Sequence, residues 1–476
     1  MTYLSVLFVP GRKAAGPIRH HFGWRRAAAP VTLLAGILAM TSPAQADPLQ
    51  AVLKDLMDSS PRLAAAKADW DAANGRASET WRKAWTPQLD LSFAQGYQNY
   101  QKPDAATRFY DARTSSAQLT QLIYDFGKSS SSVAEADAVA AQNQVAFEAV
   151  GQGLLLEAVT AFISVQRAQQ VLRFARDSEA NIREQTQLEN ALVESGKGYA
   201  SNVLQAKAQL AGASARRVRA EGALEVAQAR VRAVFGVQAS RLSYKDAVAF
   251  PEELLPTSRE LAHELALKNN LQIALGQLRS DAIKERKWST TASEFAPRIE
   301  LVGEASRDFN SDGTRGMVDD RKAMVQVSLP LNVGLGGVAA VEAVTNELLA
   351  SRRREDDTRD LVLEQVDIAW RNLLTAKENM ANLSNQMNIA TQFLEIARQE
   401  RQVGRRTLLD VLTAETNLIN AQSDYISTTY DLSIASYTLL QAIGQLEVSS
   451  IREDEAKLHA LPARSSPLPG QFVSER

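Results

Sequence analysis

The sequence predicts a mainly α-helical fold with a β contribution, built from two copies of one plan: helix, β-hairpin, then helical hairpin. Three observations predict this class: a long internal repeat, short segments of alternating polarity, and helical segments of unusual length. Of the 476 residues, 45% are apolar and 23% are charged, which excludes wholesale disorder and collagen-like repeats. A formal net charge of −2 gives no support for nucleic-acid binding.

The amino terminus, residues 1–46, has the pattern of a secretory signal peptide. It holds basic but no acidic side chains, an apolar run from Ala27 to Met40, and the small-residue motif Ala44-Gln45-Ala46. Cleavage is expected after Ala46. A transmembrane anchor is the alternative, but the apolar run is too short to span ~30 Å of hydrocarbon. The chain has no cysteine, so no lipid is attached through an N-terminal cysteine.

The remainder of the chain repeats itself at a constant separation of 208 residues. Gly196, Val203, Leu204, Ala206 and Leu210 are matched by Gly404, Val411, Leu412, Ala414 and Leu418. A constant offset indicates a duplicated domain, against the alternative of chance similarity between alanine-rich helices. The predicted organisation is a first repeat at 47–236, an inter-repeat linker at 237–260, a second repeat at 261–445 and a C-terminal tail at 446–476.

Each repeat begins with a helical segment, at 61–85 and 261–292, and continues into a β-hairpin expected at about 87–126 and 297–333. Apolar and polar residues alternate along these hairpins. The apolar set of the first strand is Leu89, Leu91, Phe93 and Tyr97. Period-2 alternation is typical of a membrane barrel strand, apolar outward and polar inward, and equally of an ordinary half-buried strand.

The rest of each repeat is predicted to be a helical hairpin, at about 128–235 and 338–444. The segment from Lys128 to about Glu194 contains no proline and would reach ~100 Å as one helix. The returning segments carry heptad spacing from Val203 and from Val411, which indicates coiled-coil packing. Glycines mark the turns between the paired helices.

Four strands in one chain do not close a barrel. If the alternating segments lie in a membrane, the sheet has to close, because unpaired strand edges are not tolerated in hydrocarbon. Two copies would supply eight strands, and side chains fill the interior of an eight-stranded barrel. Three copies would supply twelve strands, and a barrel of that size begins to leave an open lumen. A helical tube of ~100 Å attached to that barrel would span the periplasm.

Three segments resemble the TolC family of outer-membrane channels: QLIYDFGK at 121–128, GKGYASNVLQAKAQL at 196–210 and VGRRTLLDVLTAETNLINAQ at 403–422. The resemblance implies a mainly α fold with a membrane β-barrel contribution. It implies a homotrimer, with a 12-strand β-barrel in outer-membrane lipid continued by a 12-helix periplasmic α-barrel. It also implies two partners, a periplasmic adaptor (membrane fusion) protein and an inner-membrane ABC or proton-driven transporter.

The resemblance also assigns a periplasmic gate. Arg406 falls on the gate arginine, Asp410 on an aspartate of the lumenal ring, and Ser201 and Asn202 on the polar pair opposite. Asn202 replaces an acid and Thr413 replaces a second ring aspartate, so we expect a weaker link to Arg406 and a weaker cation block. The alternative is that Arg406 and Asp410 are ordinary solvated residues of a helix turn.

The resemblance further implies that the two turns dock the adaptor protein. Their candidate residues are Gly196, Gly198, Val403 and Gly404. The glycines alternatively serve as helix C-caps, and the two roles are compatible.

One motif is similar to the start of a calcium-binding loop. Its candidate ligands are Asp308, Asn310, Asp312 and Asp319. The predicted flanks are strands instead of helices, and Asp and Asn also favour turns, so a surface loop between strands is the preferred interpretation. No cofactor and no metal are expected.

The sequence therefore favours an outer-membrane channel of an export system, serving type I protein secretion, small-molecule efflux or both. The tip sequence looks more like that of secretion-type members. A soluble periplasmic coiled-coil adaptor or scaffold protein is the alternative. An enzyme is not expected, because His263 and His459 are the only histidines beyond the signal peptide and no nucleophile–base set can be assembled.

Overall fold

The computed structural model describes residues 49–100, 108–244, 247–248, 250–311, 315–330, 334–451 and 453–454. Chain contacts divide the protein into two units, Met1–Gln45 and Ala46–Arg476, and every described residue belongs to the second. The predicted signal peptide, Asp312 of the calcium-like motif and the tail beyond residue 454 lie outside the described residues.

Helices dominate the described part of the chain, and the predicted mainly α fold with a β contribution is confirmed. The first half contains α1 (Leu49–Ser59), α2 (Pro61–Trp85), β1 (Gln88–Tyr100), β2 (Arg108–Tyr124), α3 (Lys128–Glu194) and α4 (Ala200–Phe235). The second contains α5 (Arg259–Asn269), α6 (Leu271–Phe295), β4 (Arg298–Phe309), β5 (Met317–Ser328), α7 (Gly336–Gln402) and α8 (Leu408–Ala442). Two short strands, β3 (Ala247–Val248) and β6 (Glu453–Asp454), pair with each other.

The helical segment predicted at 261–292 is present, and it consists of two helices, α5 and α6, divided at Asn270. The Asn270 side chain accepts a hydrogen bond from the Gln272 N–H at 2.8 Å and donates one to the Ala442 carbonyl at 2.8 Å. Asparagine is a favoured N-cap because its side chain satisfies a free N–H at the helix start, so α6 begins anew there.

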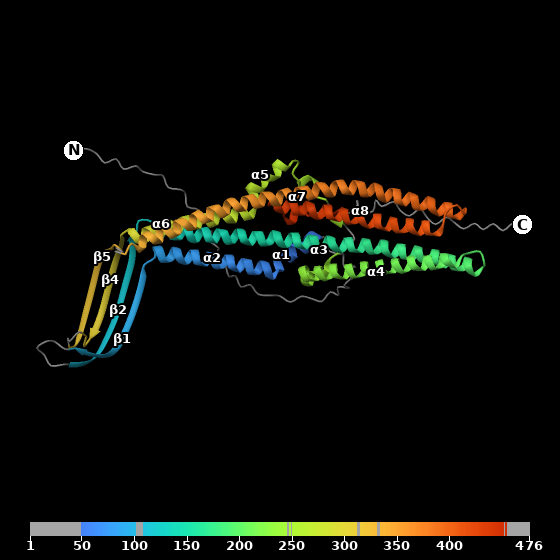
Figure 1. Cartoon of the computed structure of the whole chain (residues 1–476). Helices are drawn as coiled ribbons and strands as arrows, with labels where there is room; N and C mark the ends of the chain where they lie inside the picture. Colours follow the sequence, from blue (N-terminus) through green and yellow to red (C-terminus); the bar gives the residue numbers. More distant parts are fainter. Residues whose placement is uncertain are drawn as a thin grey trace, which may run out of the picture. The chain divides into compact units, whose positions relative to one another are not determined.

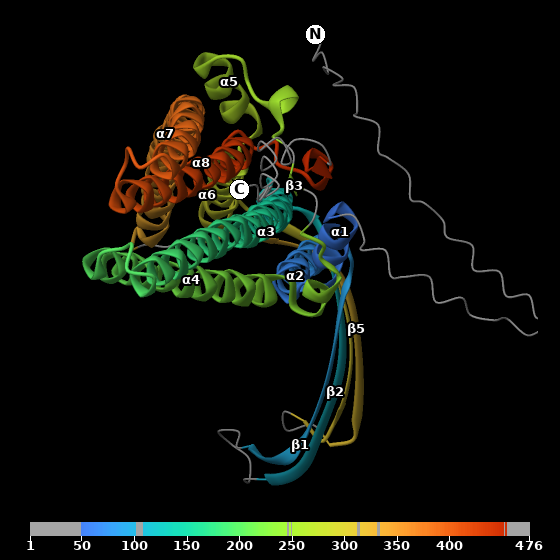
Figure 2. The same cartoon turned by 90° about the vertical axis from the view of Figure 1, so that its right-hand side faces the viewer.

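The strands form one antiparallel sheet in the order β1-β2-β4-β5, so the two hairpins pair with each other through β2 and β4 (Figures 1 and 2). Leu89 lies opposite Leu119, and Leu301 opposite Val325, which places apolar residues of odd number on one face. These side chains are exposed in the single chain. The opposite face is mainly polar, as alternation along a strand requires.

Two long helical hairpins follow the strands: α3 with α4, and α7 with α8 (Figure 1). Helices α3 and α7 each contain 67 residues, which corresponds to ~100 Å. Along α4 the buried seam is alanine at heptad spacing, with Ala206, Ala213 and Ala220. Small side chains permit a close approach to α3, so this hairpin packs tightly without large core residues.

The largest hydrophobic cluster lies where α1, α3, α5, α7 and α8 meet, and it includes the fully buried Phe162 and Tyr437. Within the described residues, α3 is the one helix that is long and apolar enough to cross a membrane by length and composition alone. Its apolar residues Leu154, Leu155 and Phe162 are buried in this cluster, so packing in the protein core accounts for them.

Candidate gate at the tips of the helical hairpins

The first tip is a turn fixed by glycine. At the end of α3, Gly196 has φ 73°, and its N–H donates to the Val193 carbonyl at 3.0 Å. The Lys197 N–H donates to the Leu192 carbonyl at 2.9 Å. This pair of bonds is the Schellman motif, which satisfies the last helix carbonyls and requires a left-handed residue. Gly196 is therefore a helix C-cap glycine.

The second tip repeats this backbone. Gly404 has φ 75°, and its N–H donates to the Arg401 carbonyl at 2.9 Å. The Arg405 N–H donates to the Glu400 carbonyl at 2.8 Å. Val403, between the helix and the glycine, is 69% exposed and leaves an apolar side chain on the outer surface of the turn.

The two tips differ at one matched position. A Cβ added to Gly198 would lie 2.9 Å from the Val193 main-chain nitrogen, so the chain packs there without room for a side chain. The residue 208 positions later is Arg406. The second tip therefore carries a long cation where the first has a close main-chain contact.

Arg406 is held within its own hairpin. Its Nε donates to Glu400 Oε2 at 2.6 Å, and its guanidinium lies 5.1 Å from the centre of the Phe393 ring. In the part of the chain that the structure describes, the side chains of Ser201 and Asn202 make no hydrogen bond to Arg406. The structure thus does not bring the predicted gate residues together in one chain, and a link between them stays a prediction for the assembled channel.

Asp410 begins α8 as part of a capping box. Its Oδ2 accepts hydrogen bonds from the Thr407 N–H at 3.2 Å and from the Thr407 hydroxyl at 2.8 Å, while the Asp410 N–H donates to Thr407 Oγ1. The hydrogen bonds from Thr407, together with the charge of Arg406, lower the pKa of the exposed Asp410 carboxyl. Asp410 is therefore ionised at neutral pH.

A buried ion pair near the tips joins the two hairpins. Glu189 of α3 pairs with Arg401 of α7. The Glu189 side chain is 3% exposed and that of Arg401 22%, and burial lowers the pKa of the Arg401 guanidinium. Sequence reasoning did not find this pair.

A second buried carboxylate connects three helices. Glu415 of α8 accepts a hydrogen bond from Asn181 Nδ2 of α3 at 2.7 Å and forms an ion pair with Arg398 of α7 at 2.7 Å. The internal repeat contains no signal for either link, because the duplicated positions of Glu189, Arg401 and Glu415 hold Ala397, Val193 and Lys207.

Farther from the tips, Glu179 fastens α3 to α4. It accepts a hydrogen bond from the Ser214 hydroxyl at 2.7 Å and pairs with Arg217 at 2.7 Å and with Arg183 at 2.9 Å. The Ser214 hydrogen bond, followed by the charges of Arg217 and Arg183, lowers the pKa of this carboxyl. All four residues of this network lie in the α3–α4 hairpin, so the network does not connect it to the α7–α8 hairpin.

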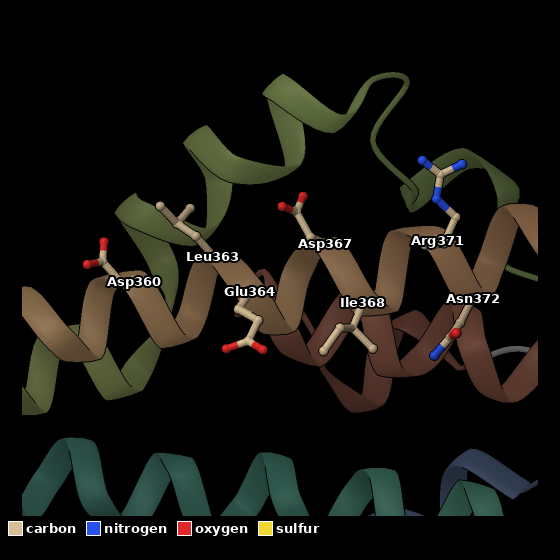
Figure 3. Close-up of a pocket in the computed structure, with 7 residues that line it drawn as sticks. All are labelled: Asp360, Leu363, Glu364, Asp367, Ile368, Arg371 and Asn372. Carbon is tan, nitrogen blue, oxygen red and sulfur yellow. The ribbon is translucent and has the colours of Figure 1, made fainter.

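An open pocket lies along α7, and Figure 3 shows the side chains that line it. Asp367 is on the side that faces α5, where it accepts hydrogen bonding from His263 Nε2 at 2.7 Å and pairs with Arg259 at 3.4 Å. These contacts hold α5 on α7, so Asp367 has a structural role.

The calcium-like motif is used in a turn. Asn310 has φ 50°, and its Oδ1 accepts a hydrogen bond from the Gly316 N–H at 3.0 Å. Asp319 lies in β5 and forms two hydrogen bonds with Arg307, at 2.7 and 3.4 Å. Among the described residues, no group of three His, Cys, Asp or Glu side chains is placed to hold a metal ion.

A sheet that is apolar on one face and polar on the other, joined to two helices of ~100 Å, is the arrangement expected of a membrane channel with a helical extension. The family model of the outer membrane efflux protein matches residues 52–237 and 262–445. The chain belongs to this family.

Individual relatives agree with the assignment. Over 435 residues the chain is 27% identical to the outer membrane protein TolC of Vibrio cholerae, covering 90% of this chain and 98% of that protein. It is 25% identical to the alkaline protease secretion protein AprF of Pseudomonas aeruginosa, covering 86% of this chain and 85% of the relative. The crystal structure of VceC from Vibrio cholerae shares the fold, with a TM-score of 0.70 at 20% identity over 83% of this chain and 96% of that one.

These matches confirm the predicted family, the class of outer-membrane export channel and the outer-membrane location with a periplasmic helical extension. Channels of this family are homotrimers that work with periplasmic adaptor proteins and inner-membrane transporters. Family membership sets aside the alternative of a soluble periplasmic scaffold.

Proposed function

We propose that three copies of this chain form one conduit through the outer membrane and the periplasm, closed at rest by the hairpin tips. One observation carries the proposal. The sheet of one chain is two-faced in polarity and ends in two edge strands, β1 and β5, each with one neighbour. In hydrocarbon both edges need a partner, and three copies give twelve strands with an open lumen.

The helices support the same assembly. Helix α3 packs against α4 and α8, and α8 packs against α7, which leaves α4 and α7 at the two ends of the row. In its half nearer the tips, helix α7 carries three exposed apolar residues: Ile389, Phe393 and Ile396. Joining α7 of one copy to α4 of the next closes a ring of helices and buries these side chains.

The gate combines links inside a chain with links between chains. The Glu189–Arg401 pair and the Glu415 network hold the two hairpins of one copy together. Arg406, Ser201 and Asn202 then form the contact between neighbouring copies, and three Asp410 carboxylates surround the axis. A ring of carboxylates favours cations, so the closed mouth is cation-selective.

The turns provide the docking surface for a periplasmic adaptor protein. Gly196 and Gly404 have open space around the position of a Cβ, and Val403 is exposed. Docking uses these turns together with Gly198, and the adaptor connects them to an inner-membrane ABC or proton-driven transporter. Because the relative AprF is a secretion protein, the cargo of this channel is proposed to be a protein exported by type I secretion, with small molecules as the second class.

No catalytic activity is proposed, because the family and the relatives are channels. The test of the proposal is extraction of the outer membrane with detergent, followed by gel analysis and conductance in planar bilayers. We expect heat-modifiable trimers, and Arg406→Ala is expected to enlarge the conductance. Recovery of the protein in the soluble periplasmic fraction would overturn the proposal, and unchanged conductance of the variant would move the closing link elsewhere.

A further inference from the structure

We infer that a row of arginines on the apolar face of the sheet, formed by Arg113, Arg307 and Arg321, binds the phosphate groups of lipid headgroups in the outer leaflet. The inference rests on the proposed channel, because the apolar face has to be the lipid-facing one. It concerns a lipid site, separate from cargo passage and gating.

The row follows from the strand register. Arg113 of β2 lies opposite Phe309 of β4, two residues from Arg307, and Arg321 of β5 lies opposite Ala305, also two residues from Arg307. Diagonal neighbours of this kind are ~7–8 Å apart. The three side chains therefore form a line across β2, β4 and β5.

All three belong to the lipid-facing set. They share parity with Leu119, Leu301 and Val325, the exposed apolar residues nearer the helices. The Arg113 side chain is 51% exposed and that of Arg307 is 61% exposed.

The height of the row matches a membrane boundary. Arg321, Arg307 and Arg113 lie seven, nine and eleven residues from the helix-side end of their own strands. At ~3.3 Å per residue and a tilt of ~40°, these separations correspond to ~18–28 Å of height. The apolar band of an outer-membrane barrel is ~25 Å tall, so the row sits at the headgroups of the leaflet away from the periplasm.

The other boundary is marked by aromatic residues. Trp85, Tyr124, Phe126 and Phe295 are exposed at the junction between the sheet and the helices. Exposed aromatic rings of this kind gather at a membrane–water interface. The apolar band therefore begins at this junction and reaches the arginine row, beyond which Phe309 and Met317 are also exposed on the same face.

Charge favours an anionic ligand on this face. Asp111 pairs with Arg113 at 2.9 Å and Asp319 with Arg307 at 2.7 Å, so two acids accompany three arginines. On the opposite face of the same strands, among the side chains that the structure describes, acids are in excess: Glu300, Glu304, Asp308 and Asp320 against Arg298 and Lys322.

Guanidinium groups suit this ligand. Each presents five N–H donors, and Arg307 uses Nε and one terminal nitrogen on Asp319, which leaves donors for a second anion. Planar pairs of N–H donors match the oxygens of a phosphate. The ligand is therefore a phosphate held at the edge of an apolar surface, as in a lipid headgroup.

The test titrates purified trimers in uncharged detergent with diphosphorylated lipid A and counts bound lipid by native mass spectrometry. The double variant Arg307→Gln with Arg321→Gln is compared with Arg298→Gln with Lys322→Gln, which removes the same charge from the same two strands on the opposite face. At about fivefold per arginine, we expect about a 25-fold loss of affinity in the first variant and little change in the second.

A single change, Arg321→Gln, keeps both ion pairs of the row, so the strands are expected to fold as before, and its expected loss is about fivefold. Equal loss in the two double variants would overturn the inference, since bulk charge would then explain it. Equal binding of fully dephosphorylated lipid A, or competition by inorganic phosphate at the same concentration, would also overturn it. Heat-modifiability and conductance of the same samples test the channel itself, so failure of the lipid site and failure of the channel are separable.

Discussion

The two hairpin tips have the same backbone and different side-chain chemistry. Each long helix ends in a Schellman turn, at Gly196 and at Gly404. In the first tip Tyr199 precedes α4 without a side-chain cap, whereas in the second Thr407 forms a capping box with Asp410. The two repeats thus share the turn, while the capping box is present in the second tip and not in the first. The geometry of the turn and the polar side-chain contacts around it are therefore separate properties, and different substitutions can change each of them.

The largest expected effect is on the ion pair that joins the hairpins. Glu189→Leu leaves Arg401 without its partner in a largely buried position, which we expect to lower the free energy of unfolding by about 3 kcal/mol. Conductance should rise, because α3 and α7 lose a link. Thermal unfolding followed by circular dichroism and bilayer recordings measure the two effects.

The double variant Glu189→Leu with Arg401→Leu is the control, because apolar replacement of both charges is expected to recover most of the stability. Glu79→Leu breaks an exposed pair with Lys83 on α2 and should leave stability nearly unchanged. A single Glu189 variant as stable as the double variant would show that this pair does not join the hairpins.

The next largest effect compares the two tips at the matched positions Gly198 and Arg406. Gly198→Ala puts a Cβ against the main chain of Val193, so we expect a loss of about 2 kcal/mol. Arg406→Ala removes the contact with Glu400 but leaves the turn intact, and its cost should be smaller. Thermal unfolding of the two variants gives the order directly. The reverse order would mean that the first tip relaxes around an added methyl group.

A smaller effect is expected when the helix N-caps of the two tips, at Tyr199 and Thr407, are exchanged. Thr407→Ala removes the N-cap of α8 and should cost about 1 kcal/mol. Tyr199→Thr gives α4 the cap that it lacks and should add stability of the same order or less. The two changes therefore act in opposite directions on thermal unfolding. A loss in both would show that the first tip does not accept the capping geometry of the second.

The smallest effect is a pH dependence confined to the second tip. Hydrogen bonds from Thr407 lower the pKa of Asp410 below its unfolded value of about 3.9. Its contribution to stability is therefore fully present above that unfolded value and is lost as pH falls through the folded pKa. In the Asp410→Asn variant, the unfolding temperature should therefore depend less on pH between the folded and the unfolded pKa of this carboxyl. Asn202→Asp, at the matched position, tests whether the first tip acquires the same dependence.

Much of the fold was predictable because it depends on local sequence. Period-2 alternation identified the strands, heptads and the lack of proline identified the long helices, and glycine marked both turns. The break at Asn270 was missed, because its second hydrogen bond goes to Ala442, 172 residues away. The signal peptide and the docking role of the tips stay predictions.

The polar links of the gate depend on features that one sequence does not reveal. Glu189 and Arg401 are 212 residues apart, and Asn181 and Glu415 are 234 residues apart. Whether such residues meet is decided by the rotation and stagger of helices ~100 Å long, where one turn moves a side chain by 5.4 Å. The lumenal-ring role of Asp410 stays a prediction, and its capping role in α8 depends on Thr407, which the sequence interpretation did not use.

The free edges of the sheet also govern how quickly the protein matures. Pairing of β1 with β2 and of β4 with β5 is local, and β2 meets β4 within the same chain. Pairing of β1 with β5 requires another molecule, so this step is at least bimolecular and its rate rises with concentration. Until then each chain presents two rows of unpaired main-chain groups, which are templates for aggregation. Slow synthesis therefore prolongs the interval in which a newly exported chain is exposed to aggregation and proteolysis.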